Sequence, residues 1–168
     1  MLQNLRKRLE RDEDGFTLIE LMVVVLIIAI LLAIAIPTFL GARERANNRA
    51  AQSSLRNAVT AAKTLFTDSQ DYEDASDNAL DGVEPSLQFE PTGTASTTAK
   101  QVSVFGGTAA ATTVSNTFYA AAKSASGTCF YIRDVAAAGG GTTYASGSGT
   151  CSATAAAALT AADWKTAW

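Results

Sequence analysis

The hydrophobic pattern of the first quarter of the chain predicts a helix long enough to cross a membrane. Only Thr17 and Glu20 interrupt the apolar run over residues 16–36, and no polar side chain occurs from Leu21 to Ile36. As a helix, these 21 residues span about 30 Å, which is the thickness of the hydrocarbon core of a bilayer. A buried helix of a soluble protein is the alternative, and the length of the aliphatic run argues against it.

A second pattern begins after Gly41 and predicts an amphipathic helix over residues 41–66. Apolar side chains recur there at helical spacing and form one stripe, whereas the polar side chains lie largely off it. The stripe consists of Ala51, Leu55, Ala58, Val59, Ala62, Leu65 and Phe66. Sustained heptads are missing, which argues against a coiled coil. We therefore expect the stripe to pack against a sheet formed by the rest of the chain.

Pro37 is the one strong interruption between the two helical patterns. Proline removes a backbone donor and clashes with the preceding turn, so the sequence predicts a kink at Pro37 and Gly41 rather than two helices. Residues 16–66 are then one long bent helix of about 75 Å, with an apolar half and an amphipathic half.

The distal half of the chain predicts an acidic connection followed by a small antiparallel sheet. Residues 67–91 are acidic and rich in turn formers, which is typical of a connecting loop. Strand patterns follow, and Ser124 to Gly127 has the composition of a hairpin turn. The candidate strands are residues 86–90, 101–105, 117–123, 128–134 and 142–145. The predicted fold class is α+β, and Trp164 and Trp168 are expected to dock the C-terminus, with contacts to neighbouring molecules as the alternative.

Composition and charge limit the kinds of binding site that the chain can form. The net charge is −3 and there is no histidine, so the chain offers neither a basic footprint for nucleic acid nor the ligands of a structural zinc site. Cys129 and Cys151 follow a membrane-length segment, which predicts a disulfide in an exported domain; two buried free thiols are the alternative. Carboxylates in the acidic connection suit calcium, but residues 77–82 lack the order of an EF-hand loop. We expect no metal and no cofactor.

The sequence also argues against an enzyme. A membrane-anchored enzyme needs a catalytic site, and without histidine there is no triad or imidazole base. No Cys-x-x-Cys motif, phosphate-binding loop or nucleophile elbow is present. A passive single-pass anchor that carries a small binding domain is a further alternative.

The residues before the apolar run decide which kind of membrane segment it is. Ala33-Ile34-Ala35 fits the cleavage pattern of an ordinary secretory signal, although the charged region before Leu21 is unusually long for one. Residues 1–15 are instead short, charged and end in Gly15, and Phe-Thr-Leu-Ile-Glu follows at once. This arrangement closely resembles the class III signal of type IV pilins and pseudopilins.

The resemblance implies a processing site and four parts of the chain. A membrane peptidase would cut between Gly15 and Phe16, and Phe16 would be N-methylated. The parts are a leader (1–15), an apolar assembly helix (16–40), its amphipathic continuation (41–66) and a distal region (67–168) with a disulfide-bounded C-terminal loop. The family often has a basic residue just before the glycine, whereas this chain has Asp12-Glu13-Asp14.

The resemblance also implies a location and partners. The precursor would sit once across the cytoplasmic membrane with its leader in the cytoplasm, and the mature chain would polymerise with its own copies into an extracellular pilus fibre. A prepilin peptidase, an inner-membrane platform protein and an assembly ATPase would be the partners, and no nucleic acid is predicted to bind directly. The pseudopilin of a type II secretion system is the alternative within the family.

Glu20 lies just inside the apolar run, where an unpaired carboxylate is unfavourable. It follows Phe16 by four residues and therefore lies on the same face of a helix, about 6 Å along the axis. Cleavage creates an amine on Phe16 that can meet Glu20 of the same or of a neighbouring chain, and the resemblance implies a role in setting register during assembly. A solvated acid at the membrane surface is the alternative.

Overall fold

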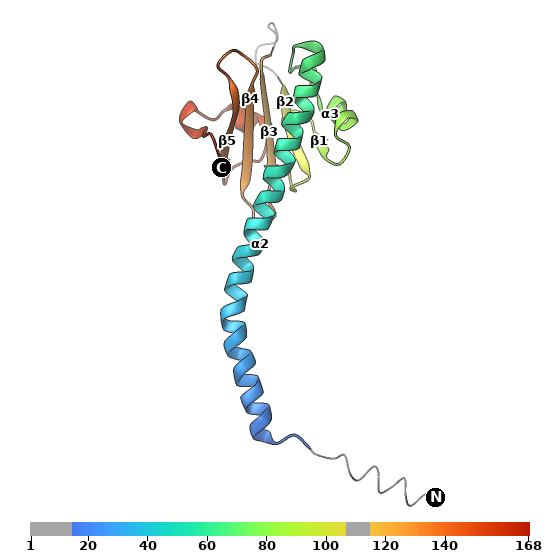
Figure 1. The fold of residues 1–168 in the computed structure, drawn as a ribbon. Coiled ribbons are helices and arrows are strands. Elements are labelled where there is room, and N and C mark those ends of the chain that lie inside the picture. Colours follow the sequence, from blue (N-terminus) through green and yellow to red (C-terminus); the bar gives the residue numbers. More distant parts are fainter. Residues whose placement is uncertain (1–14, 107–114) are drawn as a thin grey trace, which may run out of the picture. The chain divides into compact units, whose positions relative to one another are not determined.

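The computed structural model describes residues 15–106 and 115–168, so the predicted leader, except for Gly15, lies outside the described residues. The chain divides into two units, residues 1–42 and 43–168. One continuous helix, α2 (Leu18–Ser69), contributes residues to both units (Figure 1). The expectation of a single long helix with an apolar and an amphipathic half is confirmed.

Both ends of α2 are set by local backbone chemistry. The helix begins at Leu18 because Thr17 acts as its cap, and it runs three residues past the predicted end at Phe66. It stops where Gln70 adopts a positive φ of 60°, and the Gln70 amide donates to the carbonyl of Phe66 over 2.7 Å. A left-handed residue after the last turn is a common way for a helix to end.

The second unit is built on a five-stranded sheet with the strand order β1-β2-β3-β4-β5. The strands are β1 (Gln88–Glu90), β2 (Gln101–Gly106), β3 (Thr117–Lys123), β4 (Cys129–Val135) and β5 (Gly141–Gly147). β2 to β5 form antiparallel pairs between neighbours, as predicted. The turn between β3 and β4 is the predicted one, and Gly127 takes a positive φ of 93° there, a conformation that glycine adopts easily.

The first strand pair differs from the prediction of an antiparallel sheet. β1 runs parallel to β2, with Gln88 opposite Gln101 and Glu90 opposite Ser103. A parallel pair requires a crossover that returns the chain to the same end of the sheet. Residues 91–100 make that return, and Ser96 ties it to the sheet by accepting a hydrogen bond from the Lys123 amide over 2.9 Å.

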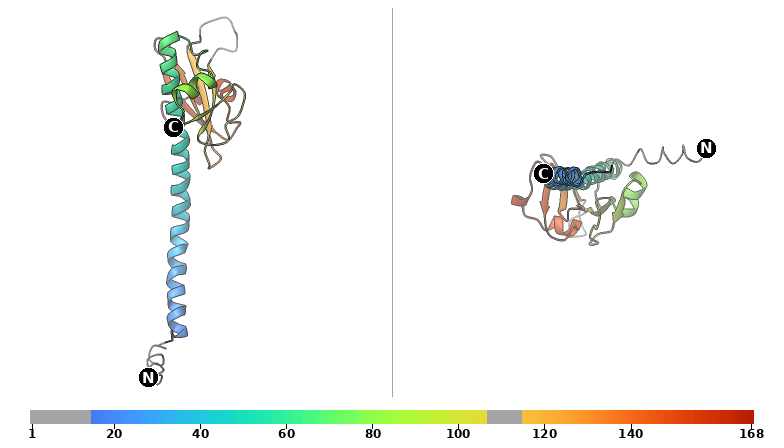
Figure 2. Two further views of the ribbon diagram at one scale, coloured as in Figure 1. Left: turned by 90° about the vertical axis from the view of Figure 1, so that its right-hand side faces the viewer. Right: turned by 90° about the horizontal axis from the view of Figure 1, so that it is seen from below.

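The sheet is covered on both faces, so the second unit has two apolar cores (Figure 2). On one face, the predicted stripe of α2 is buried against alternate strand residues such as Val104, Phe118 and Ile132. On the other face, the C-terminal segment with α4 (Ala153–Ala157) covers Ala121, Tyr131 and Ala145. The sequence analysis predicted only the first of these cores.

One segment predicted as a loop carries regular structure. The acidic connection contains α3 (Asp77–Val83), whose N-cap Ser76 accepts a hydrogen bond from the Ala79 amide. Between the two cysteines, the candidate strands 128–134 and 142–145 are confirmed as β4 and β5, which form a hairpin. The order of the acidic connection was underestimated, because a short element with small residues gives a weak periodic signal.

The predicted docking of the C-terminus is confirmed. The indole nitrogen of Trp168 donates to the carbonyl of Ala145 over 3.0 Å, and its ring lies against Tyr144 with centroids 4.4 Å apart. After the short 3-10 helix η1 (Ala161–Asp163), Lys165 forms an isolated antiparallel bridge with Tyr144. The C-terminal segment therefore partly covers the outer edge of β5, which limits unwanted pairing of that edge.

Candidate functional site

The first candidate site is the start of the described chain, where residues 15–17 lead into α2. A Cβ atom built on Gly15 would meet no other atom within 4 Å. Packing within the described residues therefore gives no reason for a glycine at this position.

Thr17 and Glu20 form a capping box at the N-terminus of α2. The Glu20 carboxylate accepts hydrogen bonds from the amide of Thr17 over 2.9 Å and from its hydroxyl over 2.6 Å, both through Oε2. The Glu20 amide donates back to the Thr17 hydroxyl over 3.3 Å. This reciprocal pattern satisfies amides that a helix start otherwise leaves unpaired, and a negative charge there favours the helix dipole.

The capping box was missed in the sequence analysis, although its signal is present. Thr-x-x-Glu just before an apolar run is the sequence signature of this motif. The structure adds that Thr17 holds Glu20 through two hydrogen bonds. Because both contacts use Oε2, the other carboxylate oxygen accepts no hydrogen bond within the described residues.

The apolar half of α2 exposes all of its large side chains. Within the first unit, Phe16 is 87% exposed and Leu31 is 60% exposed, and no residue of the most apolar 18-residue window is buried. The mean hydropathy of this window is 3.3, and the helix is long and apolar enough to cross a membrane. An exposed apolar surface of this size marks a contact with a membrane or with other protein surfaces.

Pro37 lies inside α2, which remains helical through Pro37 and Gly41. Pro37 has no amide hydrogen, so the carbonyl four residues earlier loses its usual helical donor. Next to it, the Thr38 hydroxyl donates to the carbonyls of Ile34 and Ala35 over 3.2 and 2.8 Å. The predicted kink at Pro37 and Gly41 stays a prediction.

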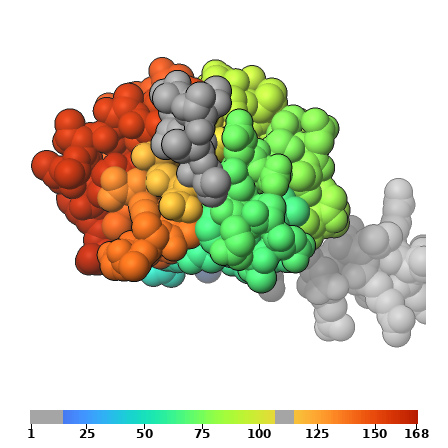
Figure 3. Space-filling model, turned by 90° about the horizontal axis from the view of Figure 1, so that it is seen from above, coloured from blue at the N-terminus to red at the C-terminus, as the bar shows by residue number. Residues whose placement is uncertain are grey.

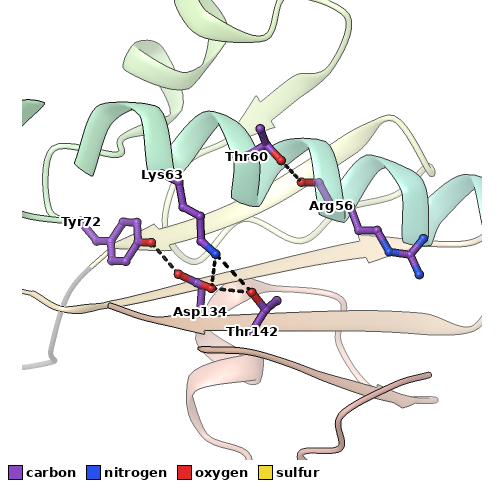
Figure 4. Close-up of polar contacts among 6 residues, drawn as sticks. All are labelled: Arg56, Thr60, Lys63, Tyr72, Asp134 and Thr142. Atoms are coloured by element: carbon purple, nitrogen blue, oxygen red, sulfur yellow. Dashed lines mark hydrogen bonds and ion pairs between the residues drawn. The ribbon is translucent and has the colours of Figure 1, made fainter. Parts of the chain in front are cut away.

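A second site, which the sequence analysis did not anticipate, lies where α2 packs on β4 and β5 (Figure 4). Asp134 is 2% exposed, and its carboxylate accepts hydrogen bonds from the Tyr72 hydroxyl and the Thr142 hydroxyl, both over 2.6 Å. The ammonium of Lys63 lies 2.9 Å from the same carboxylate. The sequence pattern could have predicted the burial of Asp134, because this residue follows Phe130 and Ile132 at the strand period of two and so faces the same core.

The surroundings of Asp134 explain its ionisation. Burial alone raises the pKa of Asp134, but hydrogen bonds from Thr142, Tyr72 and Lys63 and the positive charge of Lys63 outweigh burial, so the pKa falls below the usual value. Burial, together with the hydrogen bond to Asp134 and the charge of its carboxylate, raises the pKa of Tyr72 far above the usual value. The site therefore holds a carboxylate and a neutral phenol, which suits a structural tie between helix and sheet.

The predicted disulfide is present. Cys129 and Cys151 are bonded, with their Cα atoms 5.2 Å apart and 22 positions apart in sequence. Both cysteines are buried in the second core, next to Tyr131 and Ala156. The bridge anchors the segment that covers this face of the sheet to the start of β4.

The acidic connection does not assemble a metal site in the parts of the chain that the structure describes. No group of three or more Asp, Glu, Cys or His side chains there is arranged to hold an ion. Several carboxylates instead bind nearby amides: Asp71 accepts from Glu73 and Ser115, and Asp81 accepts from Phe89. These contacts help to order the connection.

Comparison with known proteins agrees with the geometry of the N-terminal segment. The family model of the prokaryotic N-terminal methylation motif matches residues 11–36. The chain is 48% identical over 60 residues to the type IV major pilin protein PilA of Myxococcus xanthus, covering 36% of this chain and 27% of that protein. It is 45% identical over 62 residues to the type IV wide pilus major component PilA4 of Thermus thermophilus, covering 37% of this chain and 47% of that protein.

These matches confirm the resemblance to type IV pilins and prepilins, which the sequence showed at the start of the chain. The similarity spans less than half the length of either relative, and no solved structure matches the chain. The fold of the described residues, a long N-terminal helix on a mostly antiparallel sheet, is also that of a type IV pilin. Both relatives are named as pilus components, in agreement with the expectation of a structural protein rather than an enzyme.

Proposed function

We propose that the chain is a structural subunit of a type IV pilus filament. The observation that carries this proposal is the start of α2. A methylation motif leads directly into a capped helix whose apolar half exposes all of its large side chains. A helix of this kind can reside in a membrane as a monomer and later bury the same side chains against copies of itself. Both relatives are components of such pili, which favours a pilin over a type II secretion pseudopilin.

The proposal includes processing between Gly15 and Phe16. The cut removes the leader (1–15) and creates an amine on Phe16, which is then methylated. Residues 16–40 form the assembly helix, residues 41–66 continue it with the kink at Pro37 and Gly41, and residues 67–168 form the exposed domain. Gly15 supports this proposal because the fold does not itself need a glycine there.

Glu20 is proposed to set the register between subunits. In the uncut chain Glu20 is held by Thr17 through one carboxylate oxygen, which leaves the other oxygen as an acceptor for the new amine. A subunit that docks at the wrong position along the filament axis would leave the amine and the carboxylate unpaired in apolar surroundings, which is strongly unfavourable. The pair therefore selects one position among many that hydrophobic packing alone would accept.

The proposed location follows from these steps. The precursor spans the cytoplasmic membrane once with its leader in the cytoplasm, and the mature chain is part of an extracellular fibre. Its partners are copies of itself, a prepilin peptidase, an inner-membrane platform protein and an assembly ATPase.

Removal of the gene for this chain from the producing cells tests the proposed function. Electron microscopy of fibres sheared from the cell surface should show filaments in the parent cells and none in the deletion strain, and the chain should be the main protein in the sheared fraction. Filaments of normal number in the deletion strain, without this chain in the parent's fibres, would contradict the proposal.

A further inference from the structure

The second unit carries a basic flank along α2 and an acidic segment at and after the end of α2. On α2, Arg45, Arg49, Arg56 and Lys63 are spaced by four and seven residues, so they lie along one flank of the helix. We call these four residues the basic stripe. All four side chains are exposed, and the stripe borders the buried face that contains Leu55 and Val59.

The contacts of Arg56 and Lys63 show where the basic stripe lies. Lys63 pairs with Asp134 on β4, and the guanidinium of Arg56 lies 5.0 Å from the ring centroid of Trp168. The stripe therefore runs along the edge of the unit formed by β4, β5 and the C-terminal segment. The other two residues of the basic stripe are Arg45 and Arg49. Their side chains form no ion pair and no hydrogen bond with any described residue.

The chain that follows the end of α2 is acidic. Residues 68–84 contain seven carboxylates and no Lys or Arg. They begin at the C-terminal end of α2, where Asp71 accepts from the Ser115 amide just before β3, and continue through α3, which contacts β1. In Figure 3 the C-terminal residues, in red, lie on the other side of this view from the green residues of α3. Some of these carboxylates are used locally, but Asp68, Glu73 and Asp74 are exposed and accept no hydrogen bond among the described residues. We call residues 68–84 the acidic segment.

Arg49 precedes the end of α2 at Ser69 by 20 residues, which is about 30 Å of helix, and Glu73 and Asp74 follow that end. These unpaired charges are complementary, but one molecule cannot bring them together. A contact between two different patches of identical chains is heterologous, and repetition of it gives an open helical assembly rather than a closed dimer. The charge complementarity therefore points to a second copy as the partner of the basic stripe.

We propose that Arg45 and Arg49 of one subunit bind the acidic segment of a neighbouring subunit, chiefly Glu73 and Asp74. This inference rests on the proposed filament function and adds a contact outside the apolar helix. The contact fixes the rotation of neighbouring units about the filament axis and is ionic, whereas the apolar helix supplies most of the attraction. Complementary charge of this kind mainly determines specificity.

Charge reversal tests the contact in cells that produce the full chain. The pair Arg45→Glu and Arg49→Glu, and separately the pair Glu73→Lys and Asp74→Lys, should each lower the yield of sheared filaments about tenfold, which corresponds to about 1.4 kcal/mol per contact. The four changes together should restore most of the yield. Arg43 lies about 200° around the helix from Arg45, so Arg43→Glu combined with Lys100→Glu is a control with the same change in charge and no expected effect.

Cysteine crosslinking gives a second measurement that does not depend on yield. The chain has no free cysteine among its described residues, so Arg49→Cys combined with Asp74→Cys should produce a ladder of disulfide-linked multimers on non-reducing gels, and Arg43→Cys combined with Asp74→Cys should not.

Normal wild-type filaments, together with no rescue by the four changes and no ladder, would overturn this inference and leave the proposed function intact. That result would assign the basic stripe to another partner, such as anionic lipid. Wild-type cells without filaments would refute the proposed function itself and this inference with it.

Discussion

The ammonium of Lys63 on α2 lies 2.9 Å from the buried carboxylate of Asp134 on β4, which ties the amphipathic half of the helix to the sheet. The same carboxylate accepts the hydroxyls of Tyr72 and Thr142. Each polar group of this cluster is paired, which is the condition under which a buried charge is tolerated. The cluster lies close to the end of α2, where the chain turns away from the helix.

Substitution of Asp134 by alanine should lower the free energy of unfolding by about 2–3 kcal/mol, because it leaves the buried Tyr72 hydroxyl without an acceptor. The loss stays below that of a fully buried ion pair because Lys63 is 50% exposed and recovers hydration. Tyr72→Phe removes one hydrogen bond and should cost about 1 kcal/mol. Urea unfolding of the detergent-solubilised chain measures both, and equal losses would show that the carboxylate has no special role.

Acid should weaken the fold through Asp134. The folded-state pKa of Asp134 is lowered, so its contribution to stability is fully present above the unfolded pKa of about 3.9 and is lost as pH falls through the folded pKa. Unfolding free energies between about pH 2 and pH 6, compared between the wild type and Asp134→Asn, should therefore converge at the acid end. A difference that stays constant down to the lowest pH would contradict this assignment.

Loss of the Cys129–Cys151 disulfide should destabilise the second unit. The bridge closes a loop across a sequence separation of 22 residues, for which the chain-entropy relation gives about 3 kcal/mol. The variant Cys129→Ser combined with Cys151→Ser should unfold at correspondingly lower urea, and reduction of the wild type should reproduce the effect. Ser148→Ala, at an exposed position before Cys151, serves as a control that leaves the bridge intact.

Glu20 caps α2 and is proposed to set the register between subunits, and a pair of variants separates these two roles. Thr17→Ala removes the hydroxyl of the capping box but keeps the carboxylate, whereas Glu20→Ala removes both the cap and the partner of the Phe16 amine. Glu20→Ala should leave cleavage intact and sharply reduce filament yield, and Thr17→Ala should reduce it far less. Equal effects of the two substitutions would reduce Glu20 to a capping residue.

The strongest sequence signals predicted the fold best. The apolar run and the stripe from Ala51 to Phe66 specified one long helix, because helical periodicity over many turns is distinctive. The hairpin around Gly127 and the docking of Trp168 were also predicted correctly. The parallel pairing of β1 was not, because the direction of a three-residue strand depends on the path of the connection and leaves little trace in local composition.

The candidate sites also differ in how far the sequence predicted them. Gly15, Phe16 and Glu20 were singled out because a specific motif joins them. The Asp134 cluster was missed because its members come from α2, β4, β5 and the segment after α2, and only the fold brings Lys63, Tyr72 and Thr142 together. The capping box could have been predicted from Thr17 and Glu20 alone.

The central claim is that the chain is cut at Gly15 to create the amine that pairs with Glu20 in a filament. Intact-mass and N-terminal analysis of protein from sheared filaments tests it most directly. We expect a chain that begins at Phe16 and carries one methyl group on its N-terminus. Filaments built from chains that retain residues 1–15, or that begin after Ala35, would contradict it.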